Sequence, residues 1–278
     1  MSKFSDKMRN GTLADHADWE THLIEAHAKE PSMTPEAFAG FRTEDGFSSY
    51  EILAGELTSN DRNVVDLACG DGHLIPYMLL KLPADATILG VDMSPESIDL
   101  AKKQIVDSRV RFEVGRAQAL SVSGGSVDHV LCHLAYMLMA PVEPVVKEMR
   151  RVLRPGGQFS AVVTGGRATD LYKEIQRLTG LFVQAHIPRY GDARKGSAGD
   201  GSALEEAFGR VETREYYLKY HVPPEGILEY LKNMYFMPML PDHARRELND
   251  DLMTLARDHL DAQGKVLFYV PMKLITAR

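Results

Sequence analysis

Between Asn63 and Thr164 the chain alternates short apolar stretches with longer amphipathic ones, and this alternation constrains its fold strongly. Strands are predicted at Val64–Ala68, Thr87–Val91, Val110–Val114, Val127–Cys132 and Gln158–Thr164, and helices at His73–Leu82, Ser94–Val106 and Val142–Leu153. Helices of roughly 10 to 15 residues between such strands are typical of βαβ units, in which parallel strands are covered by helices. The sequence therefore predicts an α/β domain on a mainly parallel sheet.

The flanking regions follow different patterns. Residues 1–57 contain no strand pattern and are predicted to be helical. Beyond Gly166, helices are predicted at 168–184, 224–234 and 241–263, a mobile loop at 189–202, and strands at 211–222 and 265–276. Pro271 interrupts the last strand, which predicts a sheet edge or a bulge, because proline donates no ladder hydrogen bond.

Composition narrows the class of protein. The chain has 278 residues, with 32 basic and 39 acidic side chains and a net charge of −7. This balance disfavours a nucleic-acid substrate, since neutralising phosphates dominates that kind of affinity. No apolar run approaches the roughly 20 residues that span a bilayer, and the N-terminus is polar, so we expect a soluble cytoplasmic protein. Cys69 and Cys132 lie in apolar segments and are expected to be buried, reduced thiols.

The stretch Val64–Ile75 (VVDLACGDGHLI) carries the chemistry. It predicts a strand, a tight glycine turn and a helix, so that the backbone approaches a ligand closely and the helix presents free N–H groups. The dinucleotide fingerprint requires a third glycine, but Ile75 stands there. Asp71 in the turn would repel a pyrophosphate. An acidic turn instead suits a cationic ligand without phosphate, such as S-adenosylmethionine.

At these residues the chain resembles the class I S-adenosylmethionine-dependent methyltransferases. Their first motif is matched by Asp66, Ala68, Gly70 and Gly72, with alanine in place of the first glycine. Asp92 stands where the family holds the ribose hydroxyls, and a carboxylate accepts both donors at once. The resemblance implies that Met93 packs against the adenine.

Two later segments extend this resemblance. They are the fourth strand with its flanks, Ser126–His133, and the turn Arg151–Gly157. The implied fold is a Rossmann-like seven-stranded sheet whose last strand is antiparallel, with a helical cap. We expect residues 1–57 to form that cap and residues 58–278 the methyltransferase domain, with helical lid insertions around 166–208 and 223–263.

One position departs from the family. Many members carry Gly-Asp-Ala after the third strand, and the aspartate binds the adenine amino group. This chain has Gly115-Arg116-Ala117-Gln118. We hypothesise that Gln118 supplies an amide oxygen instead and that the Ala117 N–H reaches a ring nitrogen.

Several side chains near the predicted cleft are compatible either with a functional role or with a purely structural one. His133 and Tyr136 follow the fourth strand, where side chains enter the cleft, and each is either a catalytic or substrate-contacting group or part of the cleft wall. Tyr50 and Trp19 either bind the cofactor, by cation–π attraction to its sulfonium, or simply pack.

Two further segments contain residue types that often bind ligands. The histidines between residues 16 and 27 lack the helical spacing of a metal pair, and no metal is expected. Residues 233–240, rich in methionine and aromatics, form either a substrate pocket or the underside of a lid.

The resemblance implies methyl transfer from S-adenosylmethionine to a small, largely apolar molecule, as in specialised metabolism. One alternative is an enzyme of the same fold that performs cyclisation, lysis or rearrangement. RNA or protein methylation is a second, disfavoured because no Asn/Asp-Pro-Pro-Tyr/Phe motif follows the fourth strand, where Cys132–Tyr136 stands. A homodimer is compatible with these features, and no membrane partner is expected.

Overall fold

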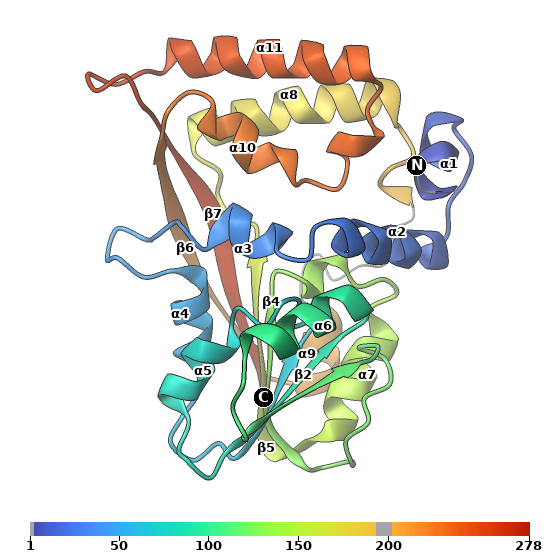
Figure 1. Cartoon of the computed structure of the whole chain (residues 1–278), viewed down its shortest axis with the longest axis vertical. Coiled ribbons are helices and arrows are strands. Elements are labelled where there is room, and N and C mark those ends of the chain that lie inside the picture. The colour runs from blue at the N-terminus through green and yellow to red at the C-terminus, as the bar shows by residue number, and fades with distance from the viewer. Residues whose placement is uncertain (1–2, 193–201) are drawn as a thin grey trace.

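Seven strands form one sheet in the order β3-β2-β1-β4-β5-β7-β6 in the computed structural model, which describes residues 3–192 and 202–278 (Figure 1). The strands are β1 Asn63–Leu67, β2 Thr87–Asp92, β3 Val110–Val114, β4 Val127–His133, β5 Leu153–Thr164, β6 Val211–Val222 and β7 Val266–Ala277. β7 is antiparallel to both of its neighbours, whereas the pairs among β1 to β5 are parallel. The predicted Rossmann-like architecture is confirmed.

Some helices pack on the two faces of this sheet, and others lie beyond one of its ends. Their bounds are α1 Lys3–Arg9, α2 His16–Lys29, α3 Met33–Phe38, α4 Ser49–Ala54, α5 Ile75–Lys81, α6 Pro95–Gln104, α7 Glu143–Val152, α8 Asp170–His186, α9 Ser202–Phe208, α10 Gly226–Lys232 and α11 Asp242–Asp258. Side chains of α4, α5 and α6 join one apolar core, and those of α7 and α9 join the other. The strand residues alternate between the two cores, as expected for a sheet covered on both sides.

The remaining helices gather beyond one end of the sheet. Figure 1 places α8, α10 and α11 at the top of the molecule, with α2 and α3 between them and the sheet. β6 and β7 extend well past the other strands toward these helices, pairing with each other from Val211↔Ala277 to Val222↔Val266. None of the described helices is long and apolar enough to cross a membrane.

The last strand differs from the sequence-based expectation. β7 does not lie at an edge but between β5 and β6. Pro271 is tolerated because the β5 ladder ends at Thr164↔Met272, one residue short of it, while on the β6 side Pro271 faces Tyr217. Proline therefore marks the point where β7 loses one of its two neighbours.

Local capping explains where two N-terminal helices begin. The Asp15 side chain accepts from the Asp18 N–H at the start of α2, and Ser48 accepts from the Glu51 N–H at the start of α4. In each case the residue at the third helical position returns a bond to the cap, which completes a capping box. Most of the predicted loop at 189–202 lies outside the described residues.

Candidate functional site

A cavity lies at the carboxyl ends of β1, β2 and β4, beneath α2. This is where α/β sheets bind their ligands. Ten of the twelve predicted site residues line it: Trp19, Tyr50, Asp66, Ala68, Gly70, Asp92, Met93, Ala117, Gln118 and His133. The fold thus collects residues that are far apart in the sequence into one concave site.

The glycine turn follows β1 through left-handed backbone. Ala68, Gly70 and Gly72 have φ values of 56°, 54° and 82°. A Cβ on Gly70 would meet nothing within 4 Å, so the turn leaves open space there. A Cβ on Gly72 would lie 2.9 Å from Ile105 Cδ1. Gly72 does not line the cavity, which corrects its predicted contact with the ligand: it lets the turn pack closely on its neighbours.

Asp66 is the most unusual group in the cavity. Its side chain is 1% exposed, and among the described residues its Oδ2 has no hydrogen-bond partner. Burial, followed by the charges of Asp92 and Asp71, raises the pKa of Asp66 to about 8. Buried polar atoms are normally paired, so a carboxyl left this way marks a position where a ligand can supply the partner. A cation satisfies both the missing bond and the local charge.

Asp92 ends β2 with a fixed carboxylate. Oδ2 accepts from the Gly70 N–H at 2.9 Å, and Oδ1 accepts from the Ser94 N–H at 2.9 Å. Each carboxylate oxygen has a second lone-pair direction, so Asp92 keeps acceptor capacity for hydroxyl groups. Met93 follows it on the cavity wall.

The segment after β3 shows what Arg116 does in place of the aspartate that many methyltransferases carry there. Arg116 pairs with Glu20 of α2, and both side chains line the cavity. The arginine therefore connects α2 to this wall instead of offering an acceptor to the ligand. Ala117 and Gln118 line the cavity beside it, in positions compatible with their predicted adenine contacts.

His133 is held from two sides. Its Nε2 lies 2.9 Å from Ser49 Oγ, and its ring stacks on Tyr50 with 3.8 Å between centroids. Burial, with a smaller contribution from His73, lowers the pKa of His133 to about 3. A neutral imidazole with one nitrogen already engaged fits a positioning or wall residue better than a general base near neutral pH.

The structure corrects the prediction that Tyr136 shares the cleft. Its ring is 0% exposed and packs on Phe159, 5.2 Å between centroids, in the core on the α7 side of the sheet. The 3₁₀ turn Tyr136–Leu138 directs the side chain there, whereas Leu138 itself lines the cavity.

Residues of α2 form the roof of the cavity, and most were missed from sequence. Trp19, Leu23 and His27 all line it, and their spacing of four residues puts them on one helical face. Trp19 Nε1 donates to the Leu138 carbonyl at 2.9 Å, which ties the helix to the rim. The four-residue spacing of Trp19, Leu23 and His27 was the sequence signal that could have predicted this helical face.

The methionine-rich segment contributes one residue to the cavity. Tyr235 lines the wall, and its hydroxyl lies 3.0 Å from His27 Nε2. Met237 and Met239 are buried in the core instead. Both cysteines are free and buried, as predicted.

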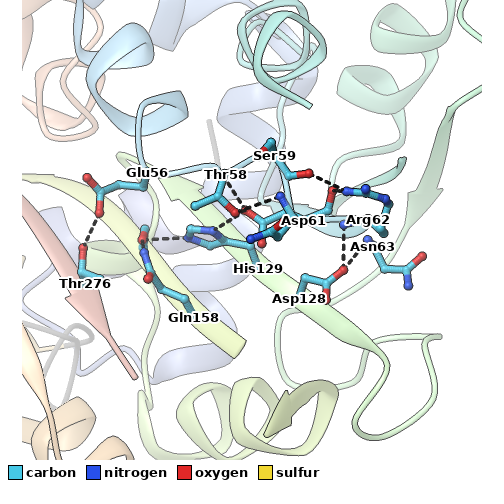
Figure 2. Close-up of polar contacts among 12 residues, drawn as sticks. Glu56, Thr58, Ser59, Asp61, Arg62, Asn63, Asp128, His129, Gln158 and Thr276 are labelled. Atoms are coloured by element: carbon cyan, nitrogen blue, oxygen red, sulfur yellow. Dashed lines mark hydrogen bonds and ion pairs between the residues drawn. The ribbon is translucent and has the colours of Figure 1, made fainter. Parts of the chain in front are cut away.

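A second polar cluster lies at the opposite ends of the strands (Figure 2). His129 Nε2 is 2.9 Å from Ser160 Oγ, and its Nδ1 is 3.7 Å from Asp61 Oδ2. The order of groups is that of a hydrolytic triad. However, His129 is 2% exposed and Ser160 is fully buried, so no substrate reaches them. The cluster joins the start of β1 to β4 and β5.

Three cavity atoms test whether S-adenosylmethionine fits. Asp66 Oδ2, His73 Nε2 and His27 Nδ1 are buried without a partner among the described residues, and all three residues line the cavity. A ligand with an ammonium group and ribose hydroxyls can donate to or accept from such atoms, whereas a pyrophosphate would be repelled by the carboxylates of Asp66, Asp71 and Asp92. The residues present fit the cofactor.

Comparisons with known proteins agree with this geometry. A family model described as a methyltransferase domain matches residues 64–157. A demethylmenaquinone methyltransferase of Deinococcus radiodurans is 31% identical over 156 residues, covering 55% of this chain and 63% of the relative. The methyltransferase GfsG of Streptomyces halstedii is 29% identical, covering 50% of each chain. The chain therefore spans only part of the length of these curated relatives.

Solved structures share the fold. The YcgJ protein of Bacillus subtilis superposes with a TM-score of 0.56 at 19% identity, covering 82% of this chain and 96% of that one. Fold and site together define a Rossmann-like protein with an acidic cavity at the carboxyl ends of its strands. Residues 64–157 thus match a methyltransferase-domain family model, within a sheet whose fold is shared with solved structures.

Proposed function

We propose that the chain is an enzyme that transfers a methyl group from S-adenosylmethionine to a small, largely apolar molecule. The observation that carries this proposal is the buried carboxyl of Asp66, whose Oδ2 has no partner among the described residues, in an acidic cavity that Trp19 and Leu23 also line. When bound, S-adenosylmethionine supplies an activated methyl group, because its sulfonium leaves as a neutral thioether.

The residues of this chain would divide the work of holding the cofactor. Asp66 would pair with its cationic portion, Asp92 would accept from the ribose hydroxyls, and Gln118 with the Ala117 N–H would meet the adenine. Tyr50, stacked on His133, presents an aromatic surface to the same cavity. A cation is attracted to such a ring face, so Tyr50 would help to hold the sulfonium.

The acceptor side supports an apolar substrate. Leu23, Pro31, Leu138 and Met139 line the cavity together with Tyr235. We propose that the helices of residues 1–57 and the insertions around 166–208 and 223–263 act as a cap. Such a cap excludes water and orients the acceptor, and for a donor that is already activated, positioning supplies much of the catalysis. We also propose that the methylated product belongs to specialised metabolism.

Incubation with S-adenosylmethionine followed by mass spectrometry tests this function. We expect S-adenosylhomocysteine to form only when an apolar phenol or quinol acceptor is present, and Asp92→Ala to suppress it. Methylthioadenosine released without acceptor would contradict methyl transfer and indicate a lyase or cyclase. Methylation of RNA or a peptide, with none of the small acceptors modified, would contradict the substrate class.

A further inference from the structure

His27 is a cavity residue that the proposed function leaves unused. Its Nε2 lies 3.0 Å from the Tyr235 hydroxyl, which fixes the ring on the wall formed by α2. Its Nδ1 is buried, and in the part of the chain that the structure describes this atom has no hydrogen-bond partner. A fixed ring with one unsatisfied nitrogen beside a cavity marks a ligand contact.

The charges around His27 select its tautomer. Burial lowers the pKa of His27, so the ring is neutral near pH 7 and carries one N–H, while Asp92 and Asp71 act in the opposite direction. These carboxylates belong to the cavity and favour an N–H that faces it. The Tyr235 hydroxyl can then donate to Nε2, which leaves Nδ1–H as a donor toward the ligand.

Asp92 alone cannot satisfy a bound diol, because it accepts hydrogen bonds but does not donate them. Its two oxygens already accept backbone N–H groups, and their remaining capacity is for further donors. A vicinal diol offers two hydroxyl hydrogens and also two oxygens that accept. Asp92 can take the hydrogens, but a carboxylate has no hydrogen to give to the oxygens.

We propose that His27 is a second ribose-binding residue, which donates from Nδ1 to a hydroxyl oxygen of the sugar that Asp92 also holds. This inference rests on the proposed function, since it takes the nucleoside of S-adenosylmethionine as the ligand. It assigns α2 a direct part in cofactor recognition. Binding of the sugar would then fix the helix that roofs the cavity.

Two substitutions separate the two nitrogens of the ring. In His27→Asn the side-chain amide occupies the Nδ1 region and the contact with Tyr235 is lost, whereas in His27→Gln the amide reaches toward Tyr235 and the Nδ1 donor is lost. Titration calorimetry with S-adenosylhomocysteine measures both. We expect His27→Gln to weaken binding about tenfold, as for one buried hydrogen bond, and His27→Asn less than about threefold.

Sugar analogues identify the partner. Removing the ribose hydroxyl that His27 contacts, in 2′-deoxy- or 3′-deoxy-S-adenosylhomocysteine, should weaken wild-type binding about tenfold more than His27→Gln binding, because both proteins lose the Asp92 contact but only the wild type loses that of His27. Equal losses in both proteins for both analogues would overturn the inference, as would wild-type affinity in His27→Gln. Thermal melting of each variant checks its folding. If the wild-type protein does not bind S-adenosylhomocysteine, the proposed function itself fails.

Discussion

We expect the Asp66 carboxyl to couple ligand binding to proton release. Because its pKa in the folded chain is about 8, it is largely protonated at pH 7, and a bound cation favours the ionised form. We expect the affinity for S-adenosylmethionine to rise as the pH increases from 6 toward 8, with protons released on binding. Calorimetry in buffers of different ionisation enthalpy measures that release. Asp66→Asn should bind weakly and lose the pH dependence, and a variant that kept the wild-type profile would contradict this role.

The same carboxyl lowers the stability of the ligand-free chain. A folded-state pKa raised from 3.8 to about 8 gives stability that is fully present below about pH 4 and is lost as the pH rises toward 8. Asp66→Asn should therefore melt close to wild type at pH 5 and at a higher temperature at pH 8. A variant that melts below the wild-type protein at pH 8 would show that the buried carboxylate has a partner in the free chain.

Alanine substitutions at the two glycines of the turn should reduce the unfolding free energy by different amounts. Gly72→Ala places a methyl 2.9 Å from Ile105 Cδ1 at positive φ, so we expect a loss of about 2–4 kcal/mol in unfolding free energy. Gly70→Ala meets no atom within 4 Å and should lose only about 1–2 kcal/mol from its backbone conformation. Chemical denaturation checks both values. Equal losses would contradict the assigned packing role of Gly72.

At the scale of elements, α2 should report on the occupied cavity. Trp19 is the single tryptophan, is 1% exposed and lines the cavity from this helix. We expect its fluorescence to change on addition of S-adenosylhomocysteine, with a midpoint equal to the calorimetric Kd. Trp19→Phe removes the signal and serves as the control. Calorimetric binding with unchanged fluorescence would contradict the placement of α2 over the cofactor.

The cluster at the other end of the strands should affect stability alone. Asp128 Oδ2 accepts from the N–H groups of Arg62 and Asn63 at 2.8 Å and 2.7 Å, which secures the start of β1 (Figure 2). Asp128→Ala leaves two backbone donors unpaired and should destabilise the chain by about 2–4 kcal/mol. Its affinity for S-adenosylhomocysteine should match the wild-type value. A selective loss of affinity in a stably folded variant would contradict this assignment.

Sequence reasoning succeeded where local pattern determines structure. β1 and its glycine turn were predicted because strand, turn and helix signals lie within one short stretch, whereas Asp92 was singled out by the resemblance to a known family. Tyr136 was placed wrongly, because a 3₁₀ turn, which leaves little trace in the sequence, rotates its ring into the core. His27 was missed because its role depends on Tyr235, more than 200 residues away.

At the scale of the whole molecule, β7 lies between β5 and β6, and β6 and β7 connect the sheet to helices that we propose as part of a cap. β6 and β7 extend past the other strands toward α8, α10 and α11, so the insertions proposed to bind the acceptor are built on strands continuous with the core. The sequence could not predict this arrangement, since Pro271 alone favours an edge. α2 and Tyr235 line the same cavity as Asp66, beyond the carboxyl ends of the strands.

Titration calorimetry of the purified chain with S-adenosylmethionine tests the central claim most directly. We predict one site per chain, a binding affinity at least about tenfold weaker in Asp92→Ala, and wild-type binding in Asp128→Ala, whose carboxylate lies at the far end of the strands. The absence of binding at millimolar ligand, or equal affinity in wild type and Asp92→Ala, would contradict the assignment of this cavity as the cofactor site.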